Sequence, residues 1–194
     1  MYTLFKPLAF LLAACALTPA QASWYLDNES SRLSFISTKD GKLSEVHRFL
    51  TLHGQIDDDG RANLRVELDS TSTGIPLRDE RLRSLLFNTE TFPEAIVSAQ
   101  LDVRPITNLA PGAQLELMLP LTVELHGQRQ TYSAELLVTR LDEQRFQVVT
   151  LAPLVLQVED FGLTAGIEAL RKLADVSAIS WSVPVGAVLI FTVR

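Results

Sequence analysis

The sequence predicts an all-β domain, an antiparallel barrel or sandwich with two short helices, and three features support this prediction. Over 115–125 every second residue is leucine or valine, and the residues between them are mainly polar. Successive side chains of a strand point to opposite faces of a sheet, so this pattern is typical of a long, half-buried strand. The alternation recurs over 95–103 and 183–193. Hairpin-length links join about eight or nine expected strands, which can bury their apolar faces together by closing into a barrel.

The N-terminal half begins with expected strands over 32–38, 45–56 and 62–71. The alternation in the second of these falters near Arg48 and Phe49, where a bulge would put the two faces back in phase. Residues 57–60, three aspartates and a glycine, predict a hairpin turn. They lack the alternating ligand spacing and the closing glutamate of a calcium loop, so a turn is the preferred interpretation.

Two segments have the periodicity of helices. Residues 75–89 place Leu82, Leu85 and Leu86 at i, i+3 and i+4, and Pro76 suits a first turn. Residues 164–175 carry a second apolar stripe, for which Thr164 is a suitable N-cap. The stripe consists of Ile167, Leu170, Leu173 and Ala174.

The remaining expected strands cover 94–104, 114–127, 131–141, 145–158 and 183–193, with a turn at 127–129. The segment 145–158 has apolar residues on both faces. We therefore expect one of its faces to meet the interior and the other a covering helix.

Length and charge restrict the possible functions. The chain has 194 residues, enough for one domain with a sizeable core, and a formal net charge of −6. This acidic balance argues against nucleic-acid binding. The single cysteine, Cys15, lies in the N-terminal segment, so the folded domain is expected to have neither a disulfide nor a thiolate site.

Residues 1–22 have the pattern of a secretory signal peptide. Lys6 precedes an apolar run over 8–17, and Ala20-Gln21-Ala22 is a small-x-small cleavage signature. The run is about half of the roughly 20 residues that a membrane helix needs, so we expect no transmembrane anchor. Cleavage after Ala22 would export a single domain over 23–194. The alternative is a lipoprotein anchored through Cys15, because residues 12–15 resemble a bacterial lipobox.

The sequence offers few candidates for catalysis or metal binding. His47, His53 and His126 are the only histidines, and none has the spacing of a common metal motif. On an unbulged strand, His47 and His53 would share a face but lie roughly 20 Å apart, too far for one metal. No nucleophile elbow or phosphate-binding loop is present, and Arg78-Asp79 suits a helix start. We expect neither catalytic residues nor a metal or cofactor.

The interior of the barrel has two possible states. Closed barrels of eight strands are either just filled by side chains or able to hold one small ligand. The inward residues are mainly leucine and valine, so a cavity would favour an apolar guest. A solid core is the alternative.

A longer motif resembles a known family. Residues 73–87, TGIPLRDERLRSLLF, run into Phe92-Pro93-Glu94 and form the most specific piece. Further matching pieces, spread over 24–193, are Trp24-Tyr25-Leu26-Asp27, Ser34-Phe35, Phe49 with Gly54 and Ile56, residues 121–127 and Asp160-Phe161-Gly162-Leu163. Together they resemble the YceI-like family of bacterial periplasmic polyisoprenoid-binding proteins. Departures are Arg81, where many members carry histidine, Leu86 for a phenylalanine, and Val97 and Ala99 for phenylalanine and serine.

The resemblance implies an eight-stranded, lipocalin-like antiparallel barrel whose tunnel holds an isoprenoid chain, such as a quinone tail, in the periplasm. It implies a non-enzymatic carrier. The alternatives are a solid-core interaction module near membrane electron-transfer proteins, and an enzyme acting on a hydrophobic small molecule. Strand parity proposes the ligand-contacting residues, which are Phe35, Leu64, Val66, Leu68, Leu82, Leu86, Val97, Leu101, Leu117, Leu119, Leu121, Val123, Leu136, Phe146, Val148, Leu189 and Phe191.

The two interpretations of the N-terminus predict different exported proteins. Ordinary cleavage predicts an intact mass that begins at Ser23 and is unchanged by a Cys15→Ser substitution. A lipoprotein would instead begin at Cys15 with the added mass of its acyl chains, and Cys15→Ser would abolish them. Mass spectrometry of the exported protein distinguishes the two.

Overall fold

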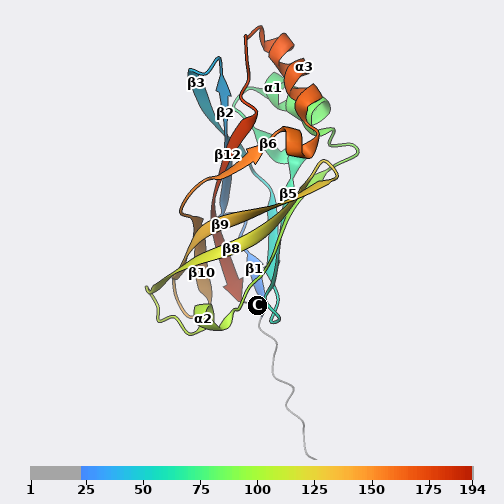
Figure 1. The fold of residues 1–194 in the computed structure, drawn as a ribbon. Helices are drawn as coiled ribbons and strands as arrows, with labels where there is room; N and C mark the ends of the chain where they lie inside the picture. Colours follow the sequence, from blue (N-terminus) through green and yellow to red (C-terminus); the bar gives the residue numbers. More distant parts are fainter. Residues whose placement is uncertain (1–22, 194) are drawn as a thin grey trace, which may run out of the picture.

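The computed structural model describes residues 23–193, which form a closed antiparallel barrel (Figure 1). Its strands are β1 (Trp24–Leu26), β2 (Arg32–Lys39), β3 (Leu43–Phe49), β4 (Leu52–Ile56), β5 (Arg61–Glu67), β6 (Thr71–Ser72), β7 (Glu94–Gln100), β8 (Gln114–Leu125), β9 (Gln128–Arg140), β10 (Arg145–Thr150), β11 (Leu154–Gln157) and β12 (Ser182–Val193). The predicted signal peptide and Cys15 lie outside the described residues.

Several short strands are segments of longer ones, which gives a barrel of eight. β12 pairs with both β1 and β2 on one side, and with both β10 and β11 on the other. In the same way β3 pairs with β2 while β4 pairs with β1. The sheet runs on through β5, β7, β8 and β9 to β10, and the β1–β12 pairing closes it. The predicted eight-stranded antiparallel barrel is confirmed.

The longest pairing is the β8–β9 hairpin, which the alternation over 114–127 predicts. Its register runs from Gln114 opposite Thr139 to Leu125 opposite Gln128. The turn is the dipeptide His126-Gly127, one residue before the predicted position, with φ of 51° and 75°. Two positive φ angles are what a type I′ hairpin turn requires, and glycine adopts them without strain.

Helices close the two ends of the barrel (Figure 1). α1 (Pro76–Arg81) continues into a π-helical segment, η2 (Leu82–Phe87), and α3 (Thr164–Ala174) packs on η2 at the same end. At the opposite end lies α2 (Arg104–Thr107). Two 3-10 turns, η1 (Leu68–Ser70) and η3 (Glu159–Phe161), complete the helical elements of the described residues.

Four local expectations are corrected by the structure. The strand expected to reach Arg104 ends at Gln100, and the unpredicted α2 begins at Arg104. Pro105 lies in its first turn, where proline is tolerated, whereas proline cannot donate to a strand ladder. Thr164 does not cap α3, since the N-cap is Leu163 and no side chain makes a capping bond. No covering helix shields the outer face of 145–158: α3 packs on η2, and Leu151, just after β10, is 47% exposed.

The fourth correction concerns the break between β3 and β4. It falls at Leu50 and Thr51, just after the predicted position, and the amides of both residues donate to Ser70 Oγ at 3.0 Å. The extra residue reverses which side chains face inward. His47 is therefore buried at 3% exposure, while His53 faces solvent and pairs with Glu67. The two histidines do not share a face.

The end of the barrel near α2 is closed by aromatic packing. Trp24 and Phe146 meet edge to face at a centroid distance of 5.5 Å, and Phe146 stacks on Phe191 at 5.4 Å. Such pairs contribute about 0.5–1.5 kcal/mol each beyond their buried area. Within residues 23–193, no helix has the length and apolar character needed to cross a membrane.

We predict that Gly166→Ala destabilises the protein although alanine favours helices. A Cβ on Gly166 would lie 2.6 Å from the carbonyl oxygen of Leu85 and 2.9 Å from Cα of Leu86. The overlap is with backbone, so α3 must move away from η2, at a cost of about 1–3 kcal/mol. Urea unfolding measures the change.

Gly186→Ala is the matched control. Its Cβ would meet only Thr150 Oγ1, at an ordinary 3.6 Å. We expect a free energy of unfolding that is unchanged or about 0.4–1 kcal/mol higher. Equal effects of the two substitutions would contradict the packing argument.

Candidate functional site

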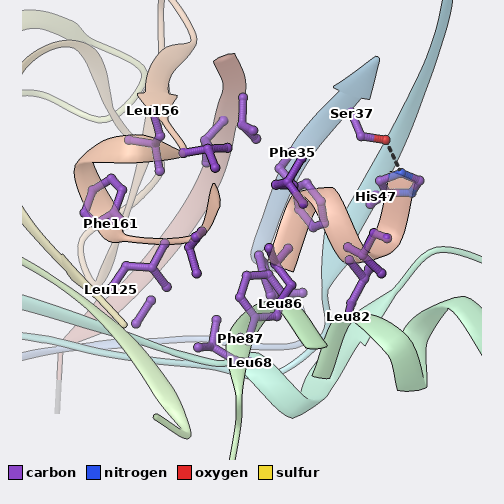
Figure 2. Close-up of a pocket in the computed structure, with 18 of the residues that line it drawn as sticks. Phe35, Ser37, His47, Leu68, Leu82, Leu86, Phe87, Leu125, Leu156 and Phe161 are labelled. Carbon is purple, nitrogen blue, oxygen red and sulfur yellow. Dashed lines mark hydrogen bonds between the residues drawn. The ribbon is translucent and has the colours of Figure 1, made fainter. Parts of the chain in front are cut away.

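A cavity of about 390 Å³ lies inside the barrel at the end covered by α1, η2 and α3. We call it the upper cavity. Its walls combine inward residues of the strands with the apolar faces of the covering helices, as Figure 2 shows. Side chains labelled there include Phe35, Leu68, Leu86, Leu125 and Phe161. Their burial is explained by the alternation of the strands and by the 3.6-residue period of the helices.

A second cavity of about 160 Å³ lies further along the barrel, towards α2. We call it the lower cavity. Leu33, Val97, Leu154 and Val185 line both cavities, so the two are adjacent. The barrel interior of the described chain is therefore hollow rather than solid. This result argues against the solid-core alternative.

The structure places every residue of the parity-derived candidate set on a cavity wall. The upper cavity is lined by Phe35, Val66, Leu68, Leu82, Leu86, Val97 and Val123. The lower cavity is lined by Leu64, Val97, Leu101, Leu117, Leu119, Leu121, Leu136, Phe146, Val148, Leu189 and Phe191. That they contact a ligand stays a prediction.

The strand-parity analysis omitted the polar residues of the upper cavity. Ser37, Lys39 and His47 line it, together with Arg78 of α1. Ser37 and Lys39 follow Phe35 at alternate positions of β2, so the same parity that selected Phe35 also selects them. The few polar groups of the interior are therefore gathered at this end of the cavity.

The cavity reaches solvent at a mouth formed by Lys39, Ile75, Leu77, Arg78 and Arg81. Ile75 is 50% exposed and Leu77 is 61% exposed, although both line the cavity. The mouth is thus partly apolar and partly basic. It lies where α1 meets the β2–β3 hairpin.

A single carboxylate organises the basic groups of the mouth. Glu45 of β3 accepts hydrogen bonds from Lys39 Nζ at 2.5 Å and from an Arg78 guanidinium nitrogen at 2.9 and 3.0 Å. The hydrogen bond from Lys39, with that from Arg78, lowers the pKa of Glu45 from 4.5 to about 2. Arg78 also donates to the carbonyl oxygen of Thr73 at 2.9 Å. These bonds fix α1 over the β2–β3 hairpin.

His47 is the most deeply buried polar group of the cavity. Its Nε2 lies 2.8 Å from Ser37 Oγ, the contact marked in Figure 2, while its Nδ1 is buried without a hydrogen-bond partner among the described residues. Burial, followed by the positive charge of Arg78, lowers the pKa of His47 below 6.5. The ring is therefore neutral at neutral pH.

The described residues contain no group of three or more histidine, cysteine, aspartate or glutamate side chains that could hold a metal ion. Ser37 and His47 have the spacing of a nucleophile and its base. In a catalytic triad a carboxylate orients the other ring nitrogen, but His47 Nδ1 has no such partner.

Comparison with known proteins identifies the family of this barrel. The family model of the YceI-like domain matches residues 24–190. The chain belongs to the YceI-like family. Family membership and the hollow barrel of this YceI-like protein support a binding role. No match was found among curated proteins.

Solved structures agree with the assignment. A polyisoprenoid-binding domain from Saccharophagus degradans, implicated in plant cell wall breakdown, is 37% identical, with a TM-score of 0.86 over 88% of this YceI-like chain and 98% of that one. BcnA of Burkholderia cenocepacia is 14% identical, with a TM-score of 0.64 over 85% of this chain and 98% of its own. Because BcnA is only 14% identical, its similarity shows a shared fold and nothing further.

We predict that His47 makes stability depend on pH below 6.5. Well above this value the ring is neutral in both the folded and the unfolded chain and contributes no dependence. As the pH falls below 6.5, the unfolded chain takes up the proton first, so the free energy of unfolding falls, by at most about 1.4 kcal/mol per pH unit. His47→Gln should remove this decrease in urea unfolding between pH 7.5 and 5.

His53→Gln is the control, because His53 is exposed on the neighbouring segment. It should keep the decrease that depends on His47. Both variants should also keep a further decrease in the free energy of unfolding as the pH falls from 4.5 towards 2, where protonation removes the Glu45 interactions. An identical pH dependence in His47→Gln and in the unsubstituted protein would show that burial of His47 is not its cause.

Proposed function

We propose that this YceI-like protein binds an isoprenoid, quinone-like or polyprenyl, or a similar lipid, with the apolar chain inside the barrel. The observation that carries the proposal is the upper cavity, about 390 Å³ in volume, with apolar walls and polar groups near one end. This volume lies within the roughly 300–1,000 Å³ of small-molecule sites. Its shape suits an amphiphile with a long tail and a small head.

The lower cavity supports a long tail. It continues the apolar interior beyond Val97 and Val185 towards α2, among leucines of β8 and the rings of Phe146 and Phe191. Burying a chain needs only apolar area, at about 25 cal/mol per Å². An elongated hollow of this kind favours a linear hydrocarbon over a compact ligand.

The proposed binding is non-covalent. Glu45 holds Lys39 and Arg78, and Asp79 accepts hydrogen bonds from the amide and hydroxyl of Thr73 at 2.8 and 2.5 Å. These acidic groups are engaged in holding the mouth together. A carrier role, rather than turnover of a hydrophobic substrate, agrees with this arrangement.

The proposed location is the periplasm, after removal of residues 1–22. In an aqueous compartment, a closed barrel would shield a lipid tail that is otherwise insoluble. Membranes, or membrane electron-transfer proteins, are the proposed donors and acceptors of the lipid. The lipoprotein form anchored through Cys15 is the alternative location.

We expect protein purified without detergent to release a bound lipid on solvent extraction, and Val97→Trp, which is larger than the phenylalanine common in the family at this position, to lower the lipid-to-protein ratio about tenfold or more. Val97 lines both cavities, so an indole ring there fills the space that the tail would occupy. Because the ring enters a hollow and not a packed core, the protein should stay folded. Mass spectrometry of the extract measures the ratio.

Ile96→Trp is the matched control. Ile96 is the neighbouring β7 residue, opposite Arg65 on β5, and it lines neither cavity. It should retain the lipid content of the unsubstituted protein. Repeated recovery of lipid-free protein that also fails to bind added prenyl quinones would contradict the proposal, as would full lipid content in a folded Val97→Trp variant.

A further inference from the structure

The upper cavity has a charge opposite to that of the whole chain. Lys39, Arg78 and Arg81 line it, whereas no aspartate or glutamate does. The chain as a whole carries a formal net charge of −6. Charges of one sign beside low-dielectric walls concentrate the electrostatic field in a cleft. The mouth therefore attracts negatively charged groups.

The nearby carboxylate does not balance these cations. Glu45 is shared between Lys39 and Arg78. Arg78 moreover has a buried Nε with no hydrogen-bond partner among the described residues. Asp79, a second carboxylate near the mouth, accepts hydrogen bonds from Thr73. Two negative charges thus stand beside the three positive charges of Lys39, Arg78 and Arg81, and the Nε–H of Arg78 remains an unused donor beside the cavity.

Arg81 is the cation without a partner. It is half-buried, one helical turn after Arg78, and residues three apart lie on the same helix face. Among residues 23–193 it makes no hydrogen bond or ion pair with a side chain. Arg83, two residues later, pairs with Glu80 and donates to the carbonyl oxygen of Asp69, away from the cavity.

His47 adds an unused group deeper in the same cavity. It is 3% exposed, and when Ser37 donates its hydroxyl to Nε2 the proton of the neutral ring resides on Nδ1. That N–H then has no acceptor among the described residues. Buried polar groups of folded proteins are normally paired, so this N–H is available to an acceptor atom of a ligand.

We propose that the ligand of the upper cavity is an amphiphile with an anionic head, a carboxylate or a phosphate, whose charge Arg81 and Arg78 neutralise. This inference rests on the proposed function and specifies its ligand class. A neutral head could accept hydrogen bonds from the same groups. It would leave the charge of Arg81 uncompensated beside an apolar wall, whereas an anionic head compensates it.

Pairs of ligands with identical tails test the inference. The probes are farnesyl phosphate against farnesol, and hexadecanoate against hexadecanol, titrated into the delipidated mature protein by calorimetry. We expect each anion to bind about tenfold or more tightly than its alcohol, because hydrogen bonds to charged groups are the stronger ones. The preference should weaken as salt is raised.

Substitutions at Arg81 locate the head group. Arg81→Gln should lower the affinity for both anions about tenfold and leave the affinity for the alcohols unchanged. Arg81→Lys should restore most of the preference. Arg83→Gln, with a cation of the same helical segment outside the cavity, should behave as the unsubstituted protein. Circular dichroism confirms folding of each variant.

The outcomes separate this inference from the proposed function. If alcohols and anions bind equally, or if Arg81→Gln keeps the full preference, the anionic head is refuted while lipid binding stands. If no member of either pair binds, the proposed function itself fails. Displacement of farnesyl phosphate by an equal concentration of inorganic phosphate would assign the basic groups to a free anion and refute the lipid head.

Discussion

The structure depends on the closure of the sheet along β12. This strand pairs with β1 and β2 on one side and with β10 and β11 on the other. Closure removes the free edges of the sheet and turns its alternating side chains into an inside and an outside. Without it, the inward leucines and valines would form one exposed apolar face. With it, they line two adjacent cavities.

The helical end decides how the interior meets solvent. Gly166 lets α3 approach the backbone of η2, and Glu45 ties Lys39 of β2 to Arg78 of α1. The first contact is apolar and close, the second is ionic and lies at the mouth. Together they produce a hollow that is apolar along its length and basic at its opening, and this polarity is the basis of both functional proposals.

The family and the residues of the cavity walls were predicted from different features of the sequence. The motif over 73–87 led to the family, and the family model over 24–190 confirmed it. Strand parity placed residues such as Phe35, Val97 and Leu119 on the cavity walls, because alternation survives folding unchanged within a regular strand. The orphaned Nδ1 of His47 and the unpaired Arg81 emerged only when segments far apart in the chain were brought together.

The sequence by itself determined most of the strands and the two main helices, since these follow from local periodicity and from the restrictions of glycine and proline. It did not fully determine which helix residues are buried, because Leu85 and Leu173 of the predicted apolar stripes are 42% and 50% exposed. It could not decide whether the barrel is filled or hollow, because that depends on how wall residues and helices fit together in three dimensions. Nor could it decide that His47 faces inward while His53 faces out. That difference follows from the break at Leu50 and Thr51, held by hydrogen bonds from Ser70, about twenty residues further along the chain.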